Sequence, residues 1–217
     1  MFKPAGIPVF PPRQDPDGDC VLVRLLAEDP WRAETLWLEG FAGGIAHRLD
    51  GSTTGALLVA DDAAELERIR HLFATRQLEK TYRFLAARDV PWDENECTAS
   101  IGHDRRHSGR MVVQRGRSTP HRGRWFPAET DFRRVAGPLF EARMRTGVMH
   151  QIRVHAAFVG IPLLGDQRYG GGKPPADAPA GVTFFLHHLG IAGPEGLRTD
   201  PVPLPSWASL PPADRRV

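Results

Sequence analysis

The pattern of apolar and polar residues predicts a helix over 62–73 more clearly than any other element. Asp62 and Glu65 have the spacing of a capping box, in which each polar side chain accepts a hydrogen bond from the backbone of the first helical turn. The apolar residues that follow recur at helical spacing at Leu66, Ile69, Leu72 and Phe73. This segment is therefore expected to form an amphipathic helix with one buried face.

Several segments have the composition typical of strands. Residues 80–86 alternate and carry aromatic and β-branched side chains, and residues 128–135 and 139–144 flank a turn at Gly137-Pro138, which predicts a hairpin. The apolar run 56–60 follows a small polar loop and indicates a buried strand. The last strand is expected at 182–186.

A further helix is predicted over 149–159, where Gly160 and Pro162 would end it. Its two faces would carry Ile152, Ala156 and Val159 on one side and His150, Arg153 and Ala157 on the other. Weaker patterns suggest short helices over 21–26 and 34–38. Extended or irregular chain is expected over 3–12, 165–180 and 201–212, where proline and glycine are frequent.

Length and composition limit the class of protein. A chain of 217 residues can bury one good core, so a single domain over residues 1–217 is expected. It has no apolar run of the roughly 20 residues needed to cross a bilayer and no signal peptide at Met1, which favours a cytoplasmic protein that binds no membrane. Cys20 and Cys97 are too far apart for a metal-binding pair and are expected to be ordinary thiols.

Positive charge is concentrated between His103 and Arg124, although the net charge is only +2. Asp104 is the only acid in this stretch, which contains seven arginines: Arg105, Arg106, Arg110, Arg115, Arg117, Arg122 and Arg124. Like charges this close repel one another unless an anion binds them, which favours contact with nucleic acid. The alternative is a solvated loop without a partner.

The stretch from Ala46 to Gly55 places Asp50 after His47 and Arg48 and before a small, turn-rich loop. Two interpretations of Asp50 are open from these residues alone. Asp50 and Arg48 could form a structural ion pair in a tight turn, or Asp50 could be a reactive carboxylate held at the start of a rigid strand.

Other familiar catalytic signatures are absent. Gly172-Lys173 is followed by proline and lacks the spacing of a phosphate-binding loop, and residues 51–55 do not match Gly-x-Ser-x-Gly. His187 and His188 are adjacent, so on a strand they would point to opposite faces and could not share a metal ion.

Four separated motifs together resemble the RluA-type RNA pseudouridine synthases. They are Lys3-Pro4-Ala5-Gly6, His47-Arg48-Leu49-Asp50 with its loop, Lys80-Thr81-Tyr82, and Thr146-Gly147 followed by His150-Gln151-Ile152-Arg153. The likeness continues through 160–166 with Tyr169, through 185–188 and through 203–205, and so covers nearly the whole chain. It implies an α/β (α+β) fold in which helices flank a mixed, largely antiparallel sheet with a central active-site cleft.

The resemblance also implies roles for particular residues. Asp50 would be the catalytic aspartate, acting as a nucleophile at the anomeric carbon of the target uridine or as a base at the neighbouring carbon. Arg153 would pair with it, and Tyr82 would pack on the target base. The substrate contacts implied are His47, Arg48, Thr53, His150, Gln151 and Leu186. The RNA backbone would lie along Arg105, Arg106, Arg110, Arg115 and Arg117.

The function implied is isomerisation of uridine to pseudouridine in structured rRNA or tRNA. It would need no cofactor and no metal, and the protein is expected to act as a monomer. The chain begins almost at the catalytic region, so the S4-type RNA-binding module of many relatives is expected to be absent.

This chain departs from the family pattern in two places. Val148 stands where the family usually has arginine, and Gly51 and Ser52 replace larger or charged residues after the aspartate. A catalytically silent RNA-binding relative is therefore an alternative, which the retained Asp50, Tyr82 and Arg153 argue against. A glycoside- or nucleoside-cleaving hydrolase would normally need a second carboxylate, and none is evident beside Asp50.

Overall fold

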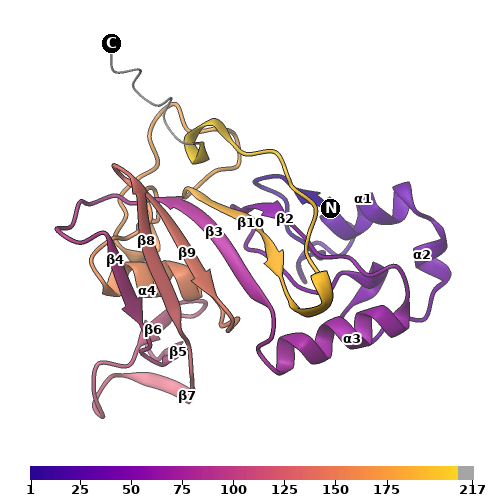
Figure 1. The fold of residues 1–217 in the computed structure, drawn as a ribbon, viewed down its shortest axis with the longest axis horizontal. Coiled ribbons are helices and arrows are strands. Elements are labelled where there is room, and N and C mark those ends of the chain that lie inside the picture. Colours follow the sequence, from indigo (N-terminus) through magenta and orange to yellow (C-terminus); the bar gives the residue numbers. More distant parts are fainter. Residues whose placement is uncertain (210–217) are drawn as a thin grey trace. The chain divides into compact units, whose positions relative to one another are not determined.

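The computed structural model describes residues 1–209, which form two compact units (Figure 1). The first unit comprises Met1–Lys80, Pro179–Val182 and His188–Pro203, and the second comprises Thr81–Ala178, Thr183–His187 and residues 204–209. The expectation of a single domain stays a prediction. No helix among residues 1–209 is long and apolar enough to span a bilayer.

The first unit contains three strands and three helices. The strands are β1 (Phe2–Lys3), β2 (Thr54–Ala56) and most of β10 (Leu186–Ala192); β1 and β2 pair antiparallel, with Lys3 opposite Gly55. The helices are α1 (Val21–Glu28), α2 (Trp31–Glu34) and α3 (Ala63–Ala74). The unit also contains two short 3-10 turns, η1 (Ala42–Gly44) between α2 and α3 and η3 (Pro194–Gly196) after β10.

Helix α3 confirms the clearest prediction from the sequence. Asp62 accepts a hydrogen bond from the Glu65 backbone N–H at 2.7 Å, and the Glu65 carboxylate in turn accepts one from the N–H of Asp61, one residue earlier than a capping box requires. The apolar face then packs into a cluster that contains Leu66, Ile69, Leu72, Leu78 and Ile191. Local capping and burial against the unit therefore favour the same element.

The helix predicted over 34–38 is wrong, because α2 ends where that helix would begin. The Trp37 indole N–H donates to the Arg32 carbonyl oxygen at 2.8 Å, and the Thr35 hydroxyl donates to the Trp31 carbonyl oxygen at 3.1 Å. Side chains thus satisfy the carbonyl groups that a continuing helix would have used. Thr35 accordingly adopts an extended backbone conformation.

In the second unit, four strands lie in the order β3, β9, β8 and β4. Their bounds are Glu79–Leu85, Leu139–Met144, Thr130–Ala136 and Glu94–Cys97. The β8–β9 pair confirms the predicted hairpin, and β8 also pairs antiparallel with β4. The rings of Phe84, Phe132 and Phe140 pack together with centroids about 6 Å apart on this sheet.

A separate antiparallel sheet of three strands carries the arginine-rich segment. It has the order β6 (Met111–Val113), β5 (Ile101–Asp104) and β7 (His121–Phe126). One face packs in a cluster that includes Ile101, Met111, Val113 and Val154. The segment is therefore part of a packed sheet, although five of its seven arginines lie in the connections between strands, and the binding of a partner stays a prediction.

Helix α4 (Gln151–Phe158) confirms the helix predicted over 149–159 but is not two-faced. All six residues from Gln151 to Ala156 are buried, including Arg153 and His155. Both His155 ring nitrogens are hydrogen bonded, with the Thr130 hydroxyl at 2.9 Å and the Ala99 carbonyl oxygen at 2.8 Å. Polar residues that are paired in this way look exposed in a hydrophobicity pattern although they are buried.

Two further predictions from the pattern need correction. No strand forms over 182–185, where the Phe185 N–H donates to the Leu164 carbonyl oxygen of a neighbouring loop at 3.1 Å. The last strand among the described residues is β10. Its sequence contains two histidines and a glycine, so it lacks the apolar and β-branched composition that is typical of a buried strand. The strand expected over 56–60 is replaced by the shorter β2, which begins two residues earlier and ends at Ala56. The loop expected over 165–180 contains one short turn, η2 (Gln167–Tyr169).

The mixed, mostly antiparallel architecture agrees with the expected fold class. The short helix over 21–26 is confirmed as α1, and Cys20 and Cys97 are both free and buried. The proline-rich tail contains η4 (Ser206–Ala208), and its last part, residues 210–212, lies outside the described residues.

The cap of α3 gives the first prediction. Asp62→Ala should lower the free energy of unfolding by about 1 kcal/mol, because the Glu65 N–H loses its acceptor. Urea denaturation followed by circular dichroism measures this. Glu67→Ala, on the exposed side of the same helix, is the control and should change stability by less than half as much. Equal effects of the two substitutions would contradict the assigned cap.

Candidate active site

Asp50 opens a tight turn in the first unit. The Thr53 N–H donates to the Asp50 carbonyl oxygen at 3.0 Å, which closes the turn over residues 50–53. Gly51 and Ser52 at its tip are held to other segments: the Gly6 N–H donates to the Gly51 carbonyl oxygen at 3.0 Å, and the Ser52 hydroxyl donates to that of Gly181 at 3.1 Å. The loop that carries the carboxylate is thus fastened on two sides.

Lys3 also holds this loop through hydrogen bonds to its backbone. Its side chain is fully buried, and its ammonium group donates to the carbonyl oxygens of Pro4, Gly51 and Thr53 at 2.9, 2.8 and 2.8 Å. All three N–H bonds of the ammonium group are therefore used. The first strand and the Asp50 turn are tied together by one charged group.

Burial lowers the pKa of Lys3 from 10.5 to about 8, and the negative charge of Asp50 offsets part of that shift. A buried ammonium group without a carboxylate in direct contact is costly to keep charged. The negative charge of Asp50 therefore favours the protonated form of Lys3. Lys3 lies in the first of the four motifs, but the sequence indicated no role for it.

The other site residues predicted in the first unit differ in their exposure. The His47 Nε2 accepts a hydrogen bond from the Leu58 N–H at 3.0 Å, and burial, then His188 and Lys80, lower its pKa well below 6.5. His47 is therefore neutral at pH 7 and packs against Phe73 and His188. Arg48 is exposed, whereas Thr53 is buried. Substrate contacts by these residues stay predictions.

In the second unit, Arg153 is held rigidly by Asp166. The guanidinium donates from Nε and Nη2 to the two carboxylate oxygens of Asp166, at 2.6 and 3.0 Å, and both side chains are buried. The Phe184 ring lies 4.2 Å from the guanidinium carbon and the Tyr169 ring 5.1 Å. A two-point ion pair between aromatic rings leaves Arg153 little freedom to rotate.

Tyr169 connects this arginine to the start of α4. Its hydroxyl is 2.8 Å from His150 Nδ1 and accepts a hydrogen bond from the Met111 N–H at 2.9 Å. Burial is the largest of several influences that together raise the Tyr169 pKa. His150 adopts a left-handed backbone conformation, with φ of 56°, which is uncommon for a residue other than glycine. Asp166 and Tyr169 were part of the resemblance found in the sequence, but the sequence suggested no function for either.

Gln151 is engaged inside the second unit. Its amide nitrogen, which carries two hydrogens, has three acceptors within reach: the Glu129 carbonyl oxygen and the hydroxyls of Thr130 and Thr146, at 2.8, 3.0 and 2.7 Å. Its amide oxygen accepts from the Thr146 hydroxyl and the Val148 N–H at 3.0 and 3.1 Å. The structure therefore gives Gln151 a supporting role, and the substrate contact expected of it stays a prediction.

Tyr82 and Leu186, the two residues expected at the target base, are both buried in the second unit. Tyr82 lies on the same face of β3 as Phe84, since alternate residues of that strand are buried. Leu186 begins β10 and is followed by His187, whose pKa is lowered to about 4 by burial and by Arg83. Their contact with a nucleotide stays a prediction.

The five arginines expected along the RNA backbone lie in the connections between β5, β6 and β7. Arg105, Arg106, Arg115 and Arg117 are exposed, as phosphate contact requires, whereas Arg110 is half-buried 3.7 Å from Asp104. Asp104 also accepts from the Arg106 and His107 backbone N–H groups. The single acid of this segment is thus already neutralised by its neighbours.

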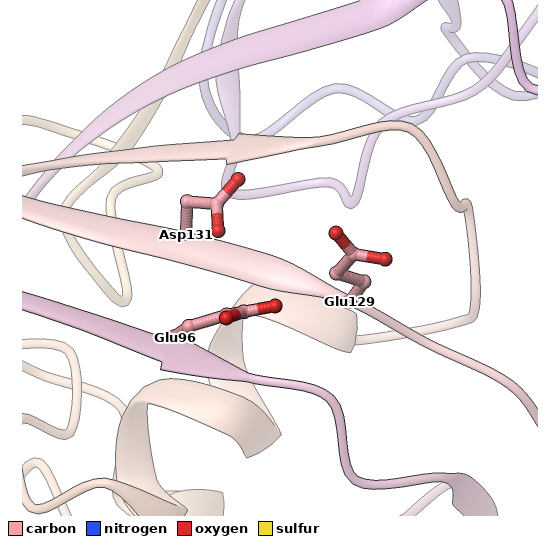
Figure 2. A group of neighbouring side chains, drawn as sticks. All are labelled: Glu96, Glu129 and Asp131. Carbon is pink, nitrogen blue, oxygen red and sulfur yellow. The ribbon is translucent and has the colours of Figure 1, made fainter.

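Three carboxylates of the second unit lie close enough to suggest a cation (Figure 2). Glu96 on β4 and Asp131 on β8 are direct cross-strand partners, and Glu129 precedes β8. One oxygen from each lies within 4.8 Å of the others. All three are exposed, and exposed acidic groups of this kind occur on many proteins without a bound ion.

Comparison with known proteins identifies the family of this chain. The family model described as RNA pseudouridylate synthase matches residues 1–158. The chain belongs to the RNA pseudouridylate synthase family. The matched range includes Lys3, the Asp50 loop, Tyr82 and the first residues of α4 through Arg153.

Individual relatives agree with the family model. The chain is 37% identical over 138 residues to RNA pseudouridine synthase 2, chloroplastic, of Arabidopsis thaliana, a match over 61% of this chain and 32% of the relative. It is 34% identical over 196 residues to ribosomal large subunit pseudouridine synthase D of Vibrio vulnificus, over 86% of this chain and 54% of the relative. The chain thus spans about a third to a half of these curated relatives.

A solved structure shows the same fold. The human protein RNA Pseudouridylate Synthase Domain Containing 1 superposes with a TM-score of 0.67 at 24% sequence identity. The superposition covers 88% of this chain and 77% of the human one. The pseudouridine synthase fold expected from the sequence motifs is therefore confirmed.

The buried Lys3 makes a prediction about pH. Between pH 8 and 10.5 the folded chain has released the Lys3 proton while the unfolded chain still binds it, so unfolding takes up a proton in this window. The stability of the wild type relative to Lys3→Met should therefore rise with pH, by up to about 1.4 kcal/mol for each unit of pKa difference.

Urea denaturation of both proteins at pH 7, 8, 9 and 10 measures the difference, and other titrating groups cancel in it. Lys173→Met, at an exposed lysine, controls for the loss of one positive charge. A stability difference that stays constant from pH 7 to 10 would show that Lys3 is not held in the environment described.

The Arg153–Asp166 pair makes a second prediction about the site. Asp166→Asn should lower the free energy of unfolding by about 3 kcal/mol, because a buried guanidinium loses its carboxylate. The double variant Arg153→Met, Asp166→Asn should recover part of that loss. Asp93→Asn is the matched control, because Asp93 pairs with Arg134 at the surface and should cost less than about 1 kcal/mol. Additive effects in the double variant would rule out the coupling.

Proposed function

We propose that this member of the family isomerises uridine to pseudouridine in structured RNA, with Asp50 as its catalytic carboxylate. The observation that carries the proposal is the Asp50 turn itself, because a buried ammonium group and two further hydrogen bonds hold it in one shape. Active carboxylates need such rigid support. The family match spans this loop.

The reaction proposed is an isomerisation, so no atom is gained or lost overall. The bond between N1 of the base and C1′ of the ribose breaks, the base turns, and C5 bonds to C1′ in its place. The proton on C5 passes to solvent and N1 gains one. Asp50 would act on the ribose, either at C1′ as a nucleophile or at C2′ as a base.

Arg153 and Tyr82 take supporting roles in this proposal. The guanidinium held by Asp166 would keep the catalytic carboxylate ionised, and the Tyr82 ring would pack on the target base. A uridine must leave its stack to be reached, which costs least in loops and bulges of a folded RNA. The name of the Vibrio vulnificus relative places its action on the large ribosomal subunit, which supports rRNA as one substrate class.

Tritium release tests the proposal. RNA transcripts of a large-subunit rRNA and total tRNA, labelled with tritium at C5 of uridine, are incubated with the wild type and with Asp50→Ala. The wild type should release tritium into water, and Asp50→Ala should lose about a thousandfold or more of the rate. Asp17→Asn, an exposed aspartate in the same unit, is the control and should keep full activity.

The other outcomes would overturn the proposal in distinguishable ways. Bound RNA without tritium release from any substrate would mean a catalytically silent relative. Free uracil would mean a hydrolase that cleaves the glycosidic bond. Release by Asp50→Ala at the wild-type rate would show that another group carries the reaction. A cytoplasmic location and a monomeric state belong to the same proposal.

A further inference from the structure

The outward face of the three-stranded sheet carries an aromatic pair that the proposed reaction does not use. On the inner face Ile101, Met111 and Val113 pack against the side of α4. Strand residues alternate between faces, so Gly102 and Val112 point to the other side. Trp125 and His121 lie over Gly102 on that outer side.

A bulge in β7 places Trp125 there. Ile101 is opposite Phe126 and His103 is opposite Arg122. These partners are two positions apart on β5 but four positions apart on β7, so β7 carries extra residues between them. Gly123 lies within the bulge with φ of 70°, which glycine adopts without strain. Bulges of this kind redirect a side chain, and here they turn the indole onto the neighbouring strand.

The Trp125 indole lies directly against the backbone of Gly102. A Cβ atom at this position would lie 2.8 Å from two Trp125 ring carbons and 3.4 Å from His121 Cβ. The Trp125 ring therefore rests directly on backbone. His121 stacks against it with ring centroids 4.0 Å apart and an angle of 28°, while its Nδ1 donates to the Thr119 carbonyl oxygen at 3.1 Å.

The pair is only partly buried, and exposed arginines lie near it in the turn after β5. Trp125 and His121 both keep part of their surface in solvent. Arg105 and Arg106, in the turn that follows β5 beside the Asp104–His121 pair, are exposed. Arg122 and Arg124 of β7 are also exposed, but Arg122 is opposite His103 and the Arg124 guanidinium lies over the Phe126 ring, on the other face of the sheet. Residues 105–124 contain no acid, and Asp104 is buried among its own partners. A fixed aromatic surface bordered by guanidinium groups suits an anionic ligand with flat rings.

We infer that the Trp125–His121 pair stacks an unpaired nucleobase of the RNA substrate, while the neighbouring arginines bind its phosphates. This rests on the proposed function and deepens it, because it names single-stranded RNA as the element recognised outside the Asp50 loop. The faces of bases are open to stacking only where the strand is unpaired, whereas phosphates are open everywhere. Charge complementarity favours RNA over a protein partner for this surface.

Binding of two fluorescein-labelled RNAs tests the inference by fluorescence anisotropy: a single-stranded decauridylate and a ten-base-pair RNA duplex. Trp125→Ala should weaken decauridylate binding about fivefold or more and leave duplex binding nearly unchanged. Trp125→Phe keeps a ring and should recover most of the affinity. Trp31→Ala removes an indole of the first unit that is more exposed than Trp125, and it should change neither RNA's binding. Thermal melting of each variant confirms that it is folded.

The arginines have a test of their own. Arg105→Gln should weaken the binding of both RNAs and lower the slope of log Kd against log salt by about one. Arg13→Gln, exposed in the first unit, is the matched control. Equal loss of single-stranded and duplex binding in Trp125→Ala would overturn the stacking inference, as would unchanged binding or a wild type that binds neither RNA.

Measuring tritium release on the same variants separates this inference from the proposed function. Trp125→Ala should raise the KM for the RNA substrate and leave kcat within about twofold, because the pair binds remote parts of the substrate equally in ground and transition states. Unchanged KM with normal turnover would overturn the inference while the proposed function stands. If the wild type shows no turnover but its binding of decauridylate depends on Trp125, the proposed function is overturned while this inference stands.

Discussion

The burial of the Lys3 ammonium group is the constraint on which the Asp50 loop depends. Its three acceptors are carbonyl oxygens of Pro4, Gly51 and Thr53, which come from two segments almost 50 residues apart. They can surround the ammonium group only when the first strand and the turn are both in place. An ammonium group in this position would be strongly destabilising without them, so a displaced loop is penalised. The position of the Asp50 loop thus depends on its hydrogen bonds with Lys3.

The second unit positions its charged group by a different arrangement with the same effect. Arg153 is fixed by two hydrogen bonds to one carboxylate and by two aromatic rings, so its geometry is set by several partners at once. Arg134 shows the contrast, because it pairs with Asp89 and Asp93 at the surface, where both carboxylates are solvated. Solvated pairs stabilise little and orient little. Buried pairs orient strongly even where their net contribution to stability is small.

The sequence predicted elements well where local and tertiary preferences agree. Helix α3 and the β8–β9 hairpin have their own caps, turns and apolar faces, and both were predicted close to their observed bounds. It failed where polar side chains replace backbone partners, as Trp37 does at the end of α2, or where a strand contains buried histidines, as β10 does. The motifs identified Asp50 and Arg153, but Lys3 and Asp166 act through carbonyl and carboxylate contacts that spacing cannot reveal.

The two departures from the family pattern have different physical meanings. The Val148 side chain packs against the cluster of Ile101, Met111 and Val113, so an apolar residue there serves the interior of the second unit. Gly51 is exposed, its φ lies outside the left-handed region, and an added Cβ would meet no atom within 4 Å. The fold therefore does not require glycine beside Asp50. The space next to Gly51 is open, and in the proposed reaction the RNA around the target uridine would approach the carboxylate through it.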